Sequence, residues 1–221
     1  MNIYLGNKDN ENVYEDLNTL NNVLLAGGPG GGKTVYFSRL LKELTSEHSP
    51  DDLRFVIYDS KAVDYFKFRD SPYLLFPITT DTKIDEFKMQ FEELKKLAEE
   101  RRTSKITKPA IIVLIDGFYM LSYWFKECSE EIIELANVSN ETNIHFFIAS
   151  QRPNHLGKQL IKAIDNKICY WLFDEKESKS FIGASGGQDL KMSGEVIVLV
   201  NGKHEKLQQK PFGDKMYLWR N

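Results

Sequence analysis

Blocks of apolar residues alternate with amphipathic stretches along the chain and predict strands that are followed by helices. The run Val23–Ala26 has no polar position, which is typical of a strand covered on both faces of a sheet. The apolar residues Phe37, Leu40, Leu41 and Leu44 follow it at helical spacing. A strand, a loop and a helix are therefore predicted in that order near the start of the chain.

The same alternation continues over the rest of the sequence. Further strands are predicted over residues 53–58, 110–115, 144–149, 167–173 and 195–200, and helices over 84–102, 130–138, 157–164 and 176–182. An extended connection is predicted over 73–78, and hairpin turns at 6–11 and at Asn201-Gly202. Strands joined by helical crossovers predict an α/β fold, with a mostly parallel sheet between helix layers and a ligand site at the carboxyl ends of the strands.

The loop after the strand 23–26 carries the strongest chemical signal. Residues 27–34 read Gly-Gly-Pro-Gly-Gly-Gly-Lys-Thr and fit the P-loop pattern G-x-x-x-x-G-K-[ST] at every fixed position. Glycines let such a loop bring several backbone N–H groups to phosphate oxygens, and the helix that follows points its positive dipole end at the anion. We expect ATP to bind at Gly27, Gly28, Pro29, Gly30, Gly31, Gly32, Lys33, Thr34 and Val35.

Three polar side chains are expected to act on the phosphates and on Mg²⁺. In a P-loop the lysine, here Lys33, reaches the β and γ phosphates, and the hydroxyl, here Thr34, holds Mg²⁺. Asp116 ends an apolar run that has the form of a Walker B strand, in which a carboxylate holds the water shell of Mg²⁺. Without the P-loop, an aspartate after an apolar strand would more often be a turn residue.

The residue after Asp116 is unusual for a hydrolytic P-loop motor. Such motors usually carry a glutamate there, because a carboxylate base polarises the attacking water, whereas this chain has Gly117. Hydrolysis is therefore expected to be slow while Mg-nucleotide binding survives. A Gly117→Glu substitution is expected to raise the rate, unless another acid takes the role.

Composition sets limits on the domain count and on the partners. The 221 residues are 42% hydrophobic and 28% charged, enough for one sizeable α/β core over 1–221, with a hairpin at 1–20 and the core at 21–221. The net charge of −3 means that any contact with nucleic acid must come from local loops or from a surface built by several subunits. Two distant cysteines, Cys128 and Cys169, indicate reduced thiols and a cytoplasmic location. No apolar run reaches the ~20 residues of a membrane helix, so membrane attachment would need a segment or a partner outside this chain.

Several separated segments together resemble the FtsK/SpoIIIE family of ring-forming, DNA-pumping ATPases, and the resemblance covers nearly the whole chain. The most specific segment is Ile-His-Phe-Phe-Ile-Ala-Ser-Gln-Arg-Pro at 144–153, which is similar to the family's Gly-Ile-His strand and its Ala-Thr-Gln-Arg-Pro signature. The other segments are the lead-in to the P-loop, the strand 55–61 that ends in Asp-Ser-Lys where the family has Asp-Pro-Lys, Glu-Arg-Arg at 100–102, Gly183-Ala184 and Gly194-Glu195. The resemblance implies a RecA-like fold, a double-stranded DNA substrate and a homo-oligomeric, hexameric ring, placed at the inner face of the cell membrane by a larger protein.

The resemblance also implies roles for residues outside the P-loop. Gln151 would be the sensor, whose amide donates to the γ-phosphate or orients water; the plainer interpretation is a polar residue at a strand end. Asp59 is the acid expected to substitute as base, and a structural partner of Lys61 is an equally good interpretation. Arg152 could contact nucleotide, a neighbouring subunit or an acidic neighbour. The arginine that the family often has before Ile-His is absent, because residues 140–143 are Asn-Glu-Thr-Asn.

Three functions remain open from the sequence. The first is the ATPase motor of an FtsK/SpoIIIE-type DNA translocase with weakened hydrolysis. The second is a degenerate ATPase module of a type VII-like protein secretion machine. The glycine at position 117, in place of the usual glutamate, favours this function. The third is a non-catalytic protein that uses ATP binding for assembly or regulation.

Overall fold

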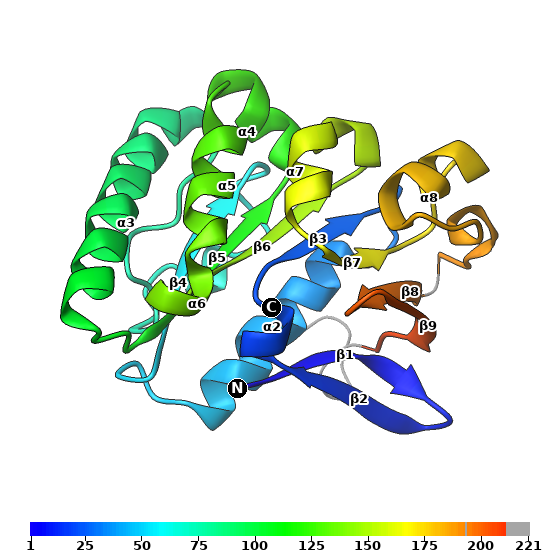
Figure 1. Ribbon diagram of the computed structural model, residues 1–221, viewed down its shortest axis with the longest axis horizontal. Coiled ribbons are helices and arrows are strands. Elements are labelled where there is room, and N and C mark those ends of the chain that lie inside the picture. Colours follow the sequence, from blue (N-terminus) through cyan, green and yellow to red (C-terminus); the bar gives the residue numbers. More distant parts are fainter. Residues whose placement is uncertain (193, 211–221) are drawn as a thin grey trace.

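A single sheet organises the part of the chain that the computed structural model describes, residues 1–192 and 194–210 (Figure 1). Nine strands lie in the order β2-β1-β9-β8-β7-β3-β6-β5-β4. Their bounds are β1 Asn2–Lys8, β2 Glu11–Asp16, β3 Val23–Ala26, β4 Leu53–Asp59, β5 Ala110–Asp116, β6 Ile144–Ser150, β7 Asn166–Cys169, β8 Glu195–Val200 and β9 Lys203–Gln208.

The connections explain the direction of each strand. The neighbours β7, β3, β6, β5 and β4 pair in parallel, as expected for strands joined by helical crossovers. The strands β8, β9, β1 and β2 pair antiparallel and extend the sheet on the other side of β7. The α/β class and the parallel half of the sheet are therefore confirmed.

Helices cover both faces of the parallel half, as Figure 1 shows. Their bounds are α1 Leu17–Leu20, α2 Lys33–Glu47, α3 Ile84–Ser104, α4 Phe118–Trp124, α5 Cys128–Asn137, α6 Ser139–Thr142, α7 Lys158–Ala163 and α8 Glu175–Ile182. Among the described residues, no helix is both long and apolar enough to cross a membrane. Cys128 and Cys169 are both buried and free.

The strands β3, β4, β5 and β6 are buried on both sides. In β3, Leu24 and Ala26 pack into the core that α3 and α5 cover, whereas Val23 and Leu25 pack into the core that α2 covers. A polar side chain at any of these positions would lose its water without gaining a partner. Polar chemistry is therefore confined to the strand ends, where the loops begin.

The structure departs from the predicted elements in several places. The strand predicted over 167–173 ends at Cys169, because Tyr170 and Trp171 turn to meet the P-loop: the Tyr170 N–H donates to Ala26, and Trp171 accepts from the Gly28 N–H. Helix α4 has no counterpart among the predicted helices, since most of its aromatic side chains are exposed and leave no apolar stripe. The first hairpin turns over Asp9 and Asn10 alone, both at positive φ.

The hairpin β1–β2 belongs to the same sheet as the nucleotide-binding half. Residue Asn7 of β1 pairs with Gln208 of β9, and the Gln209 side chain donates to the Leu5 carbonyl at 2.9 Å. That the chain forms one domain from 1 to 221 stays a prediction, and its last eleven residues lie outside the described residues.

Arg101, in the Glu-Arg-Arg segment, fixes the end of α3 to two strand entrances. Its side chain is 3% exposed and donates to the carbonyls of Thr142 and Pro109, each at 2.7 Å. The neighbouring Arg102 is exposed and pairs only with Glu99 and Glu141 among the described residues.

We predict that Arg101→Leu lowers the free energy of unfolding by about 2–4 kcal/mol, because it leaves the buried Thr142 carbonyl and the partly buried Pro109 carbonyl without the Arg101 donors. The matched change Arg102→Leu should cost less than about 1 kcal/mol, as exposed ion pairs contribute little. Urea unfolding of both variants measures the difference. Equal effects would show that Arg101 has no clamping role.

Candidate nucleotide site

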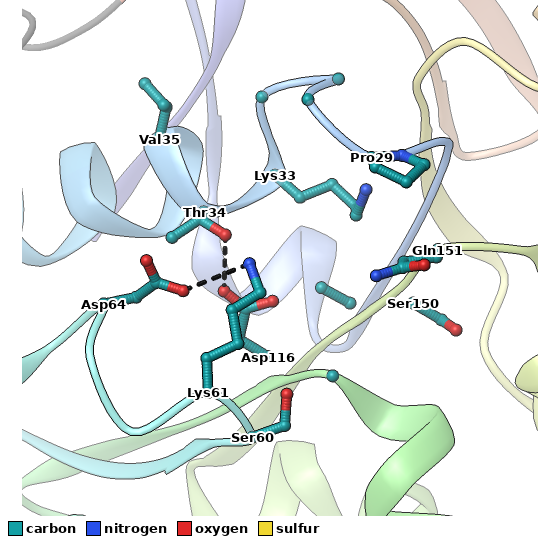
Figure 2. A pocket seen from close by; sticks show the side chains of 15 residues that line it. Pro29, Lys33, Thr34, Val35, Ser60, Lys61, Asp64, Asp116, Ser150 and Gln151 are labelled. Atoms are coloured by element: carbon teal, nitrogen blue, oxygen red, sulfur yellow. Dashed lines mark hydrogen bonds and ion pairs between the residues drawn. The ribbon is translucent and has the colours of Figure 1, made fainter.

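The P-loop emerges from β3 and closes onto the start of α2. Gly27 N–H donates to Ser150 at the end of β6 and Gly28 N–H donates to Trp171, so the loop is tied to both neighbouring segments. Gly32 precedes α2 with φ +110°, a conformation that a side chain rarely adopts. The N-terminus of α2 thus faces a cavity of about 350 Å³ at the carboxyl edge of the sheet (Figure 2).

Fifteen residues line this cavity and come from four segments. They are residues 29–35 of the P-loop and α2, Ser60, Lys61 and Asp64 after β4, Asp116 and Gly117 at the end of β5, and Ala149, Ser150 and Gln151 at the end of β6. The predicted set from Pro29 to Val35, together with Asp116 and Gln151, is therefore brought together. Gly27 and Gly28 lie at the base of the loop and do not line the cavity.

Lys33 lies inward along the loop. Its ammonium donates to the carbonyls of Gly27 and Gly28, at 2.5 and 3.0 Å. Burial lowers the pKa of Lys33 to about 8, while attraction to Asp116 opposes the shift. A cation held by backbone carbonyls exchanges them readily for phosphate oxygens, which carry more charge.

Thr34 and Asp116 meet at the place expected for Mg²⁺. The Thr34 hydroxyl donates to Oδ2 of Asp116 at 2.8 Å, and the Asp116 side chain is 9% exposed (Figure 2). One hydroxyl and one carboxylate suit a magnesium ion that keeps water ligands and binds phosphate. Within residues 1–192 and 194–210, no group of three or more His, Cys, Asp or Glu side chains offers a different metal site.

Tyr65 is a partner of Asp116 that the sequence does not indicate. Its hydroxyl donates to the same Oδ2 of Asp116 at 2.8 Å, and its side chain is buried. Burial, followed by the field of Asp116, raises the pKa of Tyr65 well above its usual value, so it stays a proton donor. The loop after β4 is therefore fixed to the end of β5.

Asp59 organises this loop and does not line the cavity. Its carboxylate accepts from the backbone N–H groups of Lys61, Asp64 and Tyr65, at 3.1, 2.9 and 3.4 Å, and the residue is 2% exposed. Burial is the first cause that raises the pKa of Asp59, and the field of Asp64 is the second. The geometry does not support Asp59 as the base, because backbone amides occupy its oxygens and it is absent from the cavity wall. Asp59 does contact Lys61, but it accepts from the backbone N–H of Lys61 and does not pair with the Lys61 side chain.

Gln151 lies at the cavity as predicted, directly after β6, which is paired with β3. Figure 2 shows its amide on the wall opposite Thr34. Of the three interpretations open for Arg152, the structure shows contact with an acidic neighbour. Its guanidinium pairs with Glu177 at 2.9 Å and lies 4.5 Å from the centre of the Phe173 ring. His145 is fully buried and hydrogen-bonded to Asn21 and Asn143.

Gly117 is required by the backbone. Its φ is +102°, and a Cβ atom there would lie 2.0 Å from Oγ and 2.6 Å from Cβ of Ser60. The Gly117→Glu change that the sequence suggests therefore does not restore a catalytic carboxylate, because its first side-chain atom overlaps Ser60. If Gly117→Glu does not raise the rate of hydrolysis, that result therefore does not test whether the site uses an acid.

We predict that Gly117→Ala lowers the free energy of unfolding by about 2–4 kcal/mol, from the left-handed backbone and the clash with Ser60. Gly183 has φ +73°, and a Cβ atom placed there would meet no neighbour within 4 Å, so Gly183→Ala isolates the backbone cost of about 1–2 kcal/mol. Thermal or urea unfolding compares the two. If Gly117→Ala lowers the free energy of unfolding less than Gly183→Ala does, the predicted clash with Ser60 is wrong.

We also predict that nucleotide affinity falls as the pH rises above about 8. The nucleotide binds the charged form of Lys33, whose lowered pKa makes that form scarce above this pH, so each pH unit costs up to about tenfold in affinity. Calorimetry in two buffers of different ionisation enthalpy should detect uptake of a proton on binding at about pH 9 and almost none at about pH 7. Constant affinity without proton uptake would contradict the lowered pKa.

The sheet and the P-loop with its Walker B aspartate define the chain as a P-loop ATPase domain of the α/β class. A solved structure of EssC (ATPases 2 and 3) from Geobacillus thermodenitrificans superposes with a TM-score of 0.81 at 18% identity, covering 97% of this chain and 45% of that one. The pCW3 conjugation coupling protein TcpA, solved with ATPγS, gives a TM-score of 0.77 at 20% identity, covering 96% and 66%.

Sequence comparison identifies the family. The chain belongs to the FtsK/SpoIIIE family, whose sequence model matches residues 2–189. It matches the DNA translocase FtsK of Borreliella burgdorferi at 28% identity over 213 residues. The matched region covers 86% of this chain and 27% of that protein. The chain therefore spans about a quarter of the length of this curated relative.

Proposed function

We propose that the chain is the motor domain of a DNA translocase, which binds Mg-ATP and couples its hydrolysis to the movement of double-stranded DNA. The observation that carries the proposal is the meeting of Lys33, Thr34 and Asp116 at the mouth of the P-loop, with Gln151 on the facing wall. The DNA substrate is inferred from relatives that are named DNA translocases. A cytoplasmic location follows from that substrate.

The site residues have distinct tasks in this proposal. Backbone N–H groups of residues 30–34 and the start of α2 bind the phosphates, and the Lys33 ammonium leaves the carbonyls of Gly27 and Gly28 to bind the β and γ phosphates. Thr34 and Asp116 would hold Mg²⁺, which would neutralise charge that develops on the phosphates. Gln151 orients the attacking water or donates to the γ-phosphate. Tyr65 keeps the Asp116 carboxylate in place.

Hydrolysis by the isolated domain is proposed to be slow. Position 117 carries no carboxylate, Asp59 faces its own loop, and residues 140–143 contain no arginine. The loss of a positioned base typically costs about 10²–10⁴-fold in rate. A neighbouring subunit in a hexameric ring would be the source of missing groups, which makes the ring part of the proposal.

Contact with DNA is proposed to be local and independent of base sequence. A chain with a net charge of −3 attracts phosphates only through basic loops, so that the affinity falls steeply with salt. A ring multiplies such weak contacts around one duplex.

A second candidate is a degenerate ATPase module of a protein secretion machine. It is favoured by the superposition on the cytoplasmic domain of the type VII secretion ATPase EccC of Thermomonospora curvata, with a TM-score of 0.79 at 17% identity, and by the glycine that the backbone needs at position 117. A role limited to ATP-dependent assembly is the third, and it predicts binding without turnover under all conditions.

We predict that the domain binds Mg-ATP and that Lys33→Ala abolishes the binding, because the side chain supplies the main positive charge to the phosphates. ATP turnover should be slow alone and should rise at least about tenfold with double-stranded DNA, if the DNA assembles the ring. Titration with a fluorescent ATP analogue and a coupled phosphate assay, with and without unrelated duplexes, measure both quantities. Sedimentation with a non-hydrolysable analogue reports the oligomer.

The outcomes separate the three functions. Binding with DNA-stimulated turnover supports the translocase. Binding with turnover that DNA leaves unchanged favours the secretion module, and binding without any turnover favours the assembly role. Equal affinity of Lys33→Ala and the unaltered protein would contradict the nucleotide site itself.

A further inference from the structure

The loop after β4 brings a second cation to the nucleotide cavity. Lys61 lines the cavity beside Asp116, and Figure 2 shows its side chain extending across Asp116 toward Thr34. The loop that carries it is held at both ends, since Asp59 accepts its N–H groups and Tyr65 donates to Asp116. The backbone of Lys61 is thus fixed relative to the predicted metal carboxylate, while its long side chain can reorient.

The present partner of Lys61 is Asp64, which also lines the cavity. Its Oδ2 lies 3.4 Å from the Lys61 ammonium, and the two side chains are 26% and 59% exposed. That oxygen is buried and accepts no hydrogen bond, so the pair is held by charge attraction alone. A partly exposed pair of this kind is weak, and a multiply charged phosphate competes with it easily.

The position of Lys61 selects one phosphate of the nucleotide. Lys33 approaches from the P-loop, whereas Lys61 approaches from the loop after β4, beside the Thr34–Asp116 contact. Mg²⁺ held by Thr34 and Asp116 would lie next to the terminal phosphate, so Lys61 would be the cation on the side of the γ-phosphate. Among its described residues, the cavity wall holds two cations and two carboxylates, Lys33, Lys61, Asp64 and Asp116. Lys61 can therefore supply positive charge on the side of the γ-phosphate.

We propose that Lys61 binds the γ-phosphate of ATP and thereby favours ATP over ADP, and that Asp64 holds the Lys61 ammonium at the cavity until the γ-phosphate displaces it. The proposal rests on the proposed ATP-binding function. It involves no bond making or breaking, because only an ion pair is exchanged. Binding of the triphosphate leaves the Asp64 carboxylate without its cation.

Calorimetric titration with a non-hydrolysable Mg-ATP analogue and with Mg-ADP tests the role of Lys61. We expect Lys61→Gln to weaken binding of the triphosphate about tenfold and to change ADP affinity less than about twofold. Lys83→Gln is the matched control, since Lys83 pairs with Glu86 and does not line the cavity. Equal weakening of both nucleotides, or of neither, would overturn the proposal.

Asp64→Asn tests the exchange. Because the change frees Lys61, we expect the triphosphate to bind about two- to threefold more tightly, and we expect no gain when Lys61→Gln is already present. Asp70→Asn, in an exposed pair with Arg69, is the control. If Asp64→Asn weakens triphosphate binding both in the unaltered protein and in the Lys61→Gln variant, Asp64 contributes to metal binding. That result would overturn the proposed exchange of ion pairs.

The two proposals fail in different ways. If the unaltered protein binds no nucleotide and Lys33→Ala behaves identically, the proposed function fails, and this inference falls with it. If Lys33→Ala abolishes binding while Lys61→Gln leaves the preference for ATP over ADP unchanged, only the inference about Lys61 is overturned.

Discussion

The carboxylate of Asp116 joins the three parts of the site. Its Oδ2 accepts from Thr34 at the start of α2 and from Tyr65 after β4, and Asp116 itself ends β5. One oxygen atom therefore sets the spacing between the start of α2, the end of β5 and the loop that carries Lys61. The arrangement is possible because the strands are buried on both faces, so that their carboxyl ends are the places where polar groups meet.

Much of the fold is predictable from local patterns. The buried strands β3 and β5 appear as unbroken apolar runs and β6 as an apolar run interrupted by His145. Helices α2 and α3 show helical spacing, because each element must cover or be covered by the sheet. The P-loop and Asp116 are predictable for a related reason: residue types at this spacing are those that a phosphate and Mg²⁺ would require. The sequence predicts strand β7 too long, because the apolar residues Tyr170 and Trp171 serve the P-loop after the strand has ended.

What the sequence does not predict depends on contacts between distant segments. The sequence suggests Asp59 as the substitute acid, but the folded loop turns Asp59 toward backbone amides and places Asp64 at the cavity. Gly117 looks like a lost catalytic residue in the sequence, whereas the contact with Ser60 makes it a steric requirement. Tyr65 gives no signal, since an aromatic residue in a loop is more often a packing residue.

The pairing of β1 with β9 has a consequence for how the chain folds as it is synthesised. Residues Asn7 and Gln208 lie far apart in the sequence, so the hairpin β1–β2 is synthesised well before its partner strand β9. Until then one edge of β1 is open, and open strand edges pair readily with other chains. The nascent protein is therefore most exposed to aggregation before β9 leaves the ribosome, and a factor that shields the first hairpin would act in that interval.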